Sequence, residues 1–146
     1  MKITLGVIGK CKPTSPEGEI IKRYQERLKW QLNIKEKDNS TQEEEAKFLQ
    51  SCINPQAKVV VLDERGKNMT SPELANIIES WMTDGTSEIC FLIGGADGHL
   101  EETRQKADLI LSFGKLTLPH ILMRAVLCEQ IYRSETIINH HPYHRI

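Results

Sequence analysis

The strongest constraint on the fold of this chain is a short apolar segment that runs into a glycine-rich loop. Residues 89–93 read Ile-Cys-Phe-Leu-Ile, with no charged or strongly polar side chain among them. Such a run is typical of a β-strand buried on both faces of a sheet. Residues 94–98 follow as Gly-Gly-Ala-Asp-Gly, where missing side chains allow positive φ angles and a close approach of a ligand to the backbone. Because ligands of open α/β sheets bind just beyond such strand ends, this loop is a candidate site.

A second apolar loop follows a few residues later. Residues 109–112 predict another strand, and residues 113–119 continue as Phe-Gly-Lys-Leu-Thr-Leu-Pro. Loops normally face water, so leucines in a loop need an explanation. A pocket for a flat heterocycle, whose polar edge is read by backbone N–H and C=O groups, would provide one.

The rest of the chain alternates strands with helices. Strands are predicted at residues 2–9, 32–34 and 58–62, and helices after start signals at residues 15–17, 40–43 and 70–73, around 100–107, and from 120 to about 137. This order predicts an α/β fold, a mostly parallel sheet with helices on both faces, in a single domain spanning residues 1–146. The third strand is expected to end at residue 62. The last helix is apolar enough to be buried on several sides, by its own sheet or by a second subunit.

Charge and composition limit the partners. The net charge is -1, whereas proteins that grip naked nucleic acid through phosphates usually carry a basic surplus. A nucleic-acid role would therefore need a local basic patch, a dimer that joins two patches, or a pre-shaped partner. No run of 18 apolar residues and no signal peptide is recognisable, so a cytoplasmic protein without a membrane span is expected.

The cysteines and histidines suggest neither disulfides nor a metal site. The four cysteines, at positions 11, 52, 90 and 128, form no C-x-x-C pair, and Cys90 and Cys128 lie in apolar runs that suit small core residues. The five histidines show no ligand spacing relative to the cysteines. We therefore expect no metal.

Three motifs, in order along the chain, carry a resemblance to a known family. They are Leu-Ile-Gly-Gly-Ala-Asp-Gly at residues 92–98, Leu-Thr-Leu-Pro-His at 116–120, and His-Pro-Tyr-His-Arg at 141–145. Together they resemble the RlmH family, bacterial large-subunit rRNA pseudouridine N3-methyltransferases of the SPOUT class. The likeness covers essentially the whole chain, and three motifs at the expected spacing are far more specific than one glycine loop.

The resemblance implies features that composition does not show. It implies a SPOUT-type C-terminal trefoil knot, a homodimer packed through the knot region, and S-adenosyl-L-methionine as methyl donor. The implied substrate is a pseudouridine in helix 69 of 23S rRNA on assembled ribosomes. A dimer that docks in a pre-formed ribosomal cleft needs no strongly basic body, which would reconcile an RNA substrate with the net charge.

The resemblance also implies which residues contact the cofactor. They are Leu62, Gly95, Gly114, Lys115, Leu116, Thr117, Leu118 and Pro119. Four of them have a structural alternative: Leu62 suits a plain core position, Gly95 a simple turn, and Leu116 with Leu118 a hydrophobic staple over the last helix.

The acceptor side of the reaction is expected at the C-terminal tail and in the last helix. His144 is the candidate general base, Arg145 and Arg124 could hold phosphate or stabilise an imide anion, and Tyr143 could stack on the base. The alternatives are a solvated end for the tail and a paired interfacial charge for Arg124.

Structural roles are expected for four further polar residues. Glu129 and Arg133, at i and i+4, suit an ion pair. His120 suits a helix cap, and Asp97 a possible cap of the helix after the glycine loop.

Two other functions remain open from the sequence. One is a SPOUT methyltransferase acting on another RNA, and the other is a non-catalytic ribosome-associated factor. A phosphate-binding glycine loop is weakly supported, because neither G-x-x-x-x-G-K-[ST] nor G-x-G-x-x-G occurs.

Overall fold

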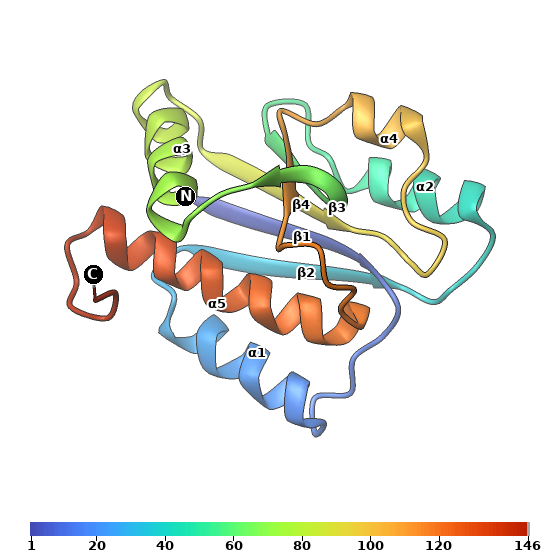
Figure 1. Ribbon diagram of the computed structural model, residues 1–146, viewed down its shortest axis with the longest axis horizontal. Helices are drawn as coiled ribbons and strands as arrows, with labels where there is room; N and C mark the ends of the chain where they lie inside the picture. The colour runs from blue at the N-terminus through green and yellow to red at the C-terminus, as the bar shows by residue number, and fades with distance from the viewer. Residues whose placement is uncertain (146) are drawn as a thin grey trace.

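The strands form one five-stranded sheet in a computed structural model that describes residues 1–145 (Figure 1). All strand pairings are parallel, in the order β2-β1-β4-β3-β5. The strands are β1 Lys2–Ile8, β2 Gln31–Lys37, β3 Lys58–Asn68, β4 Glu88–Ile93 and β5 Leu109–Ser112. The predicted α/β class is confirmed. The trefoil knot is compatible with this arrangement and stays a prediction.

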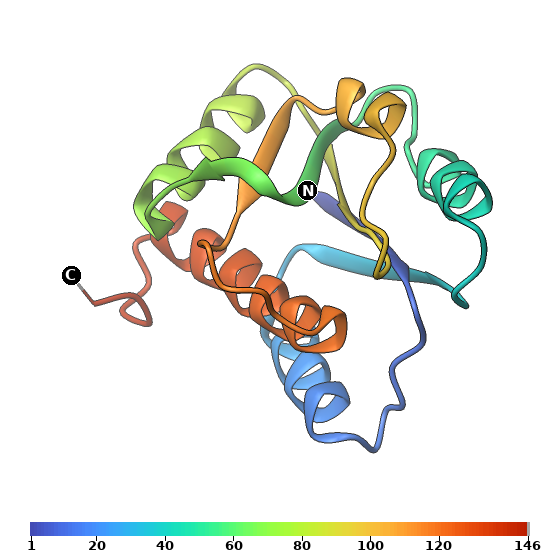
Figure 2. The same cartoon turned by 45° about the vertical axis from the view of Figure 1, so that its right-hand side comes forward.

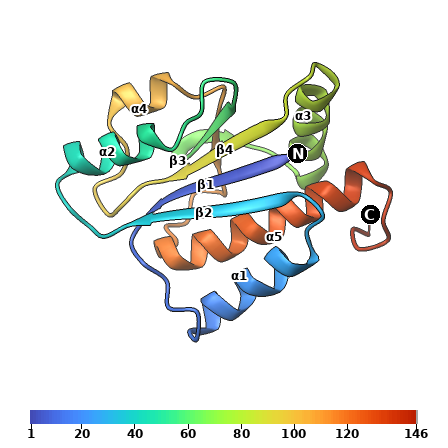
Figure 3. The same ribbon diagram turned by 180° about the vertical axis from the view of Figure 1, so that it is seen from behind.

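Helices cover both faces of the sheet (Figures 1 and 3). They are α1 Pro16–Arg27, α2 Gln42–Ser51, α3 Ser71–Thr83, α4 Glu101–Gln105 and α5 His120–Ile138. Helices α1, α3 and α5 lie on one face, and α2 and α4 on the other. Among residues 1–145, no helix combines the length and the apolar character needed to cross a membrane.

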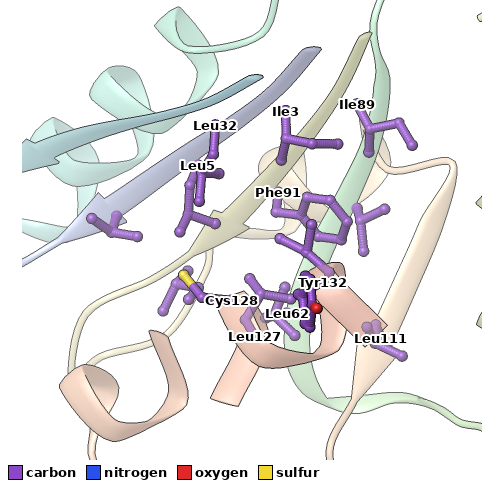
Figure 4. Close-up of a cluster of buried hydrophobic side chains, with 14 of the residues drawn as sticks. Ile3, Leu5, Leu32, Leu62, Ile89, Phe91, Leu111, Leu127, Cys128 and Tyr132 are labelled. Carbon is purple, nitrogen blue, oxygen red and sulfur yellow. The ribbon is translucent and has the colours of Figure 1, made fainter. Parts of the chain in front are cut away.

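Each face of the sheet has its own hydrophobic core. Along β4, Ile89, Phe91 and Ile93 join the larger core with side chains of α1, α3 and α5 (Figure 4). The intervening Cys90 and Leu92 join the smaller core against α2. Successive side chains of a strand point to opposite faces, so the apolar run at residues 89–93 feeds both cores, as predicted.

Helix starts follow their local signals closely. Ser15 caps α1, and Thr70 forms a capping box with Glu73 at the start of α3; both helices begin at their predicted start signals. Within the start signal at residues 40–43, Thr41 rather than Ser40 is the N-cap of α2, and the helix begins at Gln42.

Strand β3 is longer than predicted. It passes through a register shift between Leu62 and Lys67 and continues to Asn68, pairing with β5 along this second part (Figure 2). The expected end at residue 62 was wrong, because the polar residues 63–66 suggested a loop. Their polarity instead reflects exposure, since beyond Leu62 the register with β4 ends and much of β3 faces water.

Helix α5 is buried largely by its own chain. It lies between α1 and α3 against the sheet, with buried residues on several sides, among them Leu127, Cys128 and Ile131. Of the two expected sources of burial, its own sheet and helices therefore account for most of it. Leu122 near its start remains 38% exposed.

The cysteines are free thiols, and Cys90 and Cys128 are buried core residues as predicted. Within the described part of the chain, no three His, Cys, Asp or Glu side chains gather in a way that could hold a metal ion.

Candidate functional site

A cavity of about 390 Å³ opens at the carboxyl ends of β4 and β5 and beside the middle of β3, at residues 62–65. The sheet register aligns Leu62 of β3 with Ile93 of β4 on one side and with Leu111 of β5 on the other. The glycine loop after β4 and the apolar loop after β5 therefore leave the sheet side by side. Parallel strands place their carboxyl ends at one edge, where α/β proteins bind ligands, and the volume suits a small molecule.

Most residues expected to contact a cofactor line this cavity. Those that do are Leu62, Gly95, Gly114, Leu116, Thr117 and Leu118. Lys115 and Pro119 are exposed and do not line it. The cavity therefore brings together segments that are more than 50 residues apart along the chain.

The apolar loop has a backbone conformation that requires glycine at its start. Gly114 has φ +111°, in the left-handed region that L-residues with a side chain rarely adopt. Its N–H donates to Ser112 Oγ at 3.2 Å, and that hydroxyl donates to the Gly114 carbonyl at 3.0 Å. This turn sends the loop back over the sheet edge, where Leu116 is 84% exposed beside the cavity.

A side chain at position 95 would point into the body of the protein. A Cβ there would lie 2.7 Å from Glu45 Oε1 and 3.1 Å from Ile8 Cγ2. The Gly95 carbonyl also accepts from Gly98 N at 3.0 Å, which closes a turn. The turn suggested as an alternative is therefore present, and the same residue lines the cavity.

A buried cluster at one end of the cavity was missed by sequence reasoning. His99 is 6% exposed, and its Nε2 lies 3.0 Å from the Leu62 carbonyl. Arg104 donates to the His99 carbonyl at 2.7 Å and pairs with Asp63 at 3.1 Å. His99 was considered only as a metal ligand; its position directly after the glycine loop was the available signal. The partners of this cluster on β3 are distant in the sequence, so no local spacing pattern could have predicted the contacts.

Burial keeps His99 neutral. Desolvation lowers the pKa of His99, and Arg104 acts in the same direction. Asp63 and the Leu62 carbonyl oppose the shift without cancelling it.

The start of α5 completes the cavity without a side-chain cap. Pro119 is the N-cap residue, and His120 lines the cavity. No side-chain cap hydrogen bond is formed there, so the expected capping role of His120 was wrong. Asp97 was likewise wrong as a cap, since α4 begins after Leu100 without one. The polypeptide runs three residues beyond Asp97 before α4 starts.

The C-terminal tail lies at the far end of α5 from the cavity (Figure 1). Helix α5 begins beside the cavity and has 19 residues. The helix spans about 27 Å at 1.5 Å per residue, and the tail that follows it folds back, so that Tyr143 contacts Glu129 in the middle of the helix. Tyr143, His144 and Arg145 do not line the cavity of their own chain.

Tyr143 is packed against the body of the protein. Its hydroxyl donates to Glu129 Oε1 at 3.0 Å and lies 3.2 Å from the hydroxyl of Tyr24. Its ring meets Tyr132 edge-on at 4.7 Å, with the Arg133 guanidinium 5.0 Å from the ring centroid. Burial, then the bonds to Tyr24 and Glu129, raise the pKa of Tyr143, so its hydroxyl stays protonated. The solvated-end alternative was wrong for this residue.

His144 also has a partner. Arg133 pairs with Glu129 at 2.6 Å, the predicted ion pair, and its guanidinium lies 3.0 Å from His144 Nδ1. Because a guanidinium only donates, Nδ1 is the acceptor and the neutral ring carries its hydrogen on Nε2. Arg145 is exposed.

Arg124 is 2% exposed and does not line the cavity. It pairs with Glu36 at the end of β2 and donates to the Gly9 carbonyl at 2.8 Å. These contacts match the paired-charge alternative, with the pair inside one chain rather than at an interface.

Comparisons with known proteins agree on one family. A family model described as "Predicted SPOUT methyltransferase" matches residues 1–144. A relative from Rhodospirillum centenum, named "Ribosomal RNA large subunit methyltransferase H", is 40% identical over 152 residues, which covers 99% of each chain. A relative of the same name from Erythrobacter litoralis is 44% identical over 133 residues, covering 90% of this chain and 89% of its own.

A solved structure shares the fold. It is a probable methylase family protein from Haemophilus influenzae Rd KW20, with a TM-score of 0.58 and 12% identity. The match covers 99% of this chain and 70% of that one.

Proposed function

The chain belongs to the SPOUT methyltransferase family, and we propose that it transfers a methyl group from S-adenosylmethionine to the RNA of the large ribosomal subunit. The observation that carries the proposal is the full-length match to relatives named for that activity. At 99% coverage, the match includes both cavity loops and the tail. The chain would act in the cytoplasm, where ribosomes are, as one domain.

The finer proposal is methylation at N3 of a pseudouridine in helix 69 of 23S rRNA, on assembled ribosomes. Two features of the chain support it. The three motifs at residues 92–98, 116–120 and 141–145 resemble those of enzymes with this specificity. The net charge of -1 suits docking into a pre-shaped ribosomal cleft better than gripping naked RNA.

The cavity fits the chemistry of the methyl donor. It combines apolar side chains, such as Leu62 and Leu118, with glycine backbone that a nucleoside edge can approach. Leu116, 84% exposed at its side, would be covered by a flat ring. S-adenosylmethionine supplies the methyl group on a sulfonium, a good leaving group, so the main task of these residues is to hold donor and acceptor in line.

The acceptor side needs a group that deals with the N3 proton. His144 is the candidate base, but its Nδ1 is engaged by Arg133 and its Nε2 carries hydrogen. Release of Arg133 would free Nδ1 to accept a proton. Tyr143 remains protonated and would act by stacking or donating, and the exposed Arg145 could contact phosphate.

The position of the tail supports a dimer in which each tail serves its partner's cavity. Tyr143 is held against Glu129 in the middle of α5, and neither Tyr143 nor His144 lines the cavity of its own chain. Leu116 lines the cavity and Leu122 lies in the first turn of α5; both are exposed, and a second chain would cover them. The homodimer, the knot through which it would pack, and the roles of the tail residues belong to this proposal.

Two measurements test the function. Calorimetry should detect S-adenosylmethionine binding to the protein, with or without ribosomes. Mass analysis of 23S rRNA from a strain lacking the protein should show loss of one methyl group in helix 69. Binding with an unchanged helix 69 would indicate another RNA target, and absence of binding would favour a non-catalytic ribosome-associated factor.

Mixing two inactive variants tests the tail in trans. One variant lacks residues 143–146, and the other carries Gly95→Val, whose side chain cannot fit against Glu45. Co-refolded mixtures should regain about a quarter of wild-type activity, because half the dimers would contain one intact site. A tail that serves its own cavity would give no recovery.

A further inference from the structure

The buried His99 lies where two walls of the cavity meet, and the proposed transfer gives it no task. We propose that His99 is a positioning residue for the methyl donor, fixing β3 at Leu62 to the glycine loop, and that Arg104 and Asp63 hold the same two segments together. This inference rests on the proposed function. It assigns roles to three cavity residues that neither motif nor spacing identified.

The first link is a hydrogen bond from the ring to β3. His99 Nε2 lies 3.0 Å from the Leu62 carbonyl. A carbonyl only accepts, so Nε2 carries the hydrogen and the ring is the neutral Nε2–H tautomer. Because His99 follows the loop at 94–98 and Leu62 ends the buried part of β3, this bond spans the gap between two cavity walls.

The second link is the guanidinium of Arg104. It donates to the His99 carbonyl at 2.7 Å and to Asp63 Oδ2 at 3.1 Å, and its Nε donates to Glu101 at 3.0 Å. The Arg104 and Asp63 side chains are only 13% and 9% exposed, so this pair is shielded from water. Arg104 thus connects β3 with the end of the glycine loop a second time.

The third link is close packing of the ring on Gly94. A Cβ on Gly94 would lie 3.2 Å from His99 Cε1 and 3.3 Å from both ring nitrogens. A side chain at position 94 would therefore require the ring or the loop to shift by a few tenths of an ångström. The loop packs on the ring, and the ring is held by Leu62.

These links matter because donor binding depends on the spacing of the walls. Leu62, Gly94, His99 and Arg104 all line the cavity. A shift of about 1 Å in such a site is enough to weaken binding and misalign a reacting group. The cluster provides three linked constraints against that shift.

Matched substitutions at His99 test the proposal. His99→Leu keeps apolar volume and removes the donor, whereas His99→Gln retains an N–H that can reach the Leu62 carbonyl. We expect His99→Leu to raise the Kd for S-adenosylmethionine about tenfold, and His99→Gln to stay within about threefold, in keeping with the loss of one buried hydrogen bond. In turnover, the KM for the donor should rise about as much as Kd, while kcat at saturating donor changes by less than about threefold.

A stability control separates positioning from general destabilisation. Ile78→Ala creates a cavity under α3, outside the site, and should lower the melting temperature without changing Kd. Should His99→Leu fail to fold, Arg104→Met provides the second variant. It should raise Kd about fivefold, since it removes the hydrogen bonds from Arg104 to Asp63 and to the His99 carbonyl.

A double-mutant cycle tests the packing link. Gly94→Ala should weaken donor binding alone, but add little in a His99→Ala background, because the ring it would displace is gone. Independent, additive effects of the two substitutions on Kd would contradict the link.

The two proposals fail in different ways. If the wild-type protein binds no S-adenosylmethionine, the proposed function fails, and the inference with it. If the wild type binds while folded His99→Leu and Arg104→Met bind equally well, the function stands and the inference is overturned. Tenfold weaker binding by His99→Leu with rescue by His99→Gln would support it.

Discussion

His99 occupies a site in which a positive charge would be costly. Burial is the largest cause that lowers its pKa, and the neighbouring Arg104 adds to it. In the unfolded chain a histidine titrates near 6.5. The unfolded state therefore binds a proton at a higher pH than the folded state does.

That difference predicts acid sensitivity carried by one side chain. As pH falls below about 6.5, the unfolded chain gains a proton that folded His99 resists, so the free energy of unfolding falls. Asp63 and Arg104 are the charged groups that act on the ring, in opposite directions. Urea denaturation at pH 7.5 and pH 5.5 should show a smaller loss of stability for His99→Gln than for the wild type. Equal losses would mean that His99 protonates as easily in the folded protein as in the unfolded chain.

Arg124 and Glu36 are unequally buried, which makes their substitutions unequal. The side chain of Arg124 is 2% exposed and that of Glu36 is 29% exposed. Glu36→Gln leaves a buried cation without its counter-ion, which should cost about 3–5 kcal/mol of unfolding free energy. Arg124→Met leaves a carboxylate that water can reach and should cost less. Thermal and urea unfolding of both variants give the comparison.

Turnover by the Arg124→Met variant tests whether Arg124 acts in methyl transfer. If its role is structural, folded Arg124→Met retains turnover below its melting temperature. Loss of turnover with unchanged donor affinity would return Arg124 to the acceptor side of the reaction.

At the level of elements, α5 is a spacer with chemistry at both ends. Its first turn lines the cavity through His120 and Met123. The tail follows its last turn and folds back, so that Tyr143 bonds to Glu129 in the middle of α5 and to Tyr24 of α1. One rigid helix therefore separates donor binding from the candidate acceptor residues, and the two can be disrupted independently.

Removal of the tail should separate the two activities. Deletion of residues 143–146 is expected to leave the Kd for S-adenosylmethionine within about twofold of wild type while abolishing methyl transfer, because the cavity is built without the tail. Calorimetry and a ribosome methylation assay measure the two quantities. Tyr143→Phe is a milder companion, which keeps the ring on Tyr132 and removes the bonds to Tyr24 and Glu129. Full turnover by the deletion variant would contradict a role for the tail.

At the scale of the molecule, the proposed dimer would join parts that one chain keeps apart. The cavity lies at the start of α5, and the tail follows its other end (Figure 1). Leu116 at the cavity and Leu122 in the first turn of α5 are large apolar side chains left exposed. A second copy would cover these leucines and could bring its own tail within reach.

A charge at this surface should prevent association. Leu122→Glu is expected to shift the protein from dimer to monomer in light scattering, since a carboxylate in an apolar interface would be desolvated without a partner. Lys22→Glu, at an exposed position of α1, is the matched control and should remain dimeric. A dimeric Leu122→Glu variant would move the interface elsewhere.

Local signals predicted the α/β class, the buried strands and most helix starts. A capping residue such as Thr70, or the apolar run at 89–93, acts through its immediate neighbours, so its effect can be read without the rest of the chain. The predicted end of β3 was wrong because a distant element decided the outcome: the strand continues past Leu62, where β5 pairs with it. The predicted cap at Asp97 was wrong for a local reason, because three more residues precede α4.

The candidate site likewise has parts that local sequence predicted and parts that only long-range packing decided. The two loops were identifiable because glycine and exposed leucine are unusual in their sequence context, and the three motifs identified the family. The contacts of His99 with Leu62 and of Arg104 with Asp63 depend on sheet register. That register aligns residues that are 31 or more positions apart in the sequence. The separation of cavity and tail depends on the straight path of α5. Both are long-range results of packing, which arises only when the whole chain has folded.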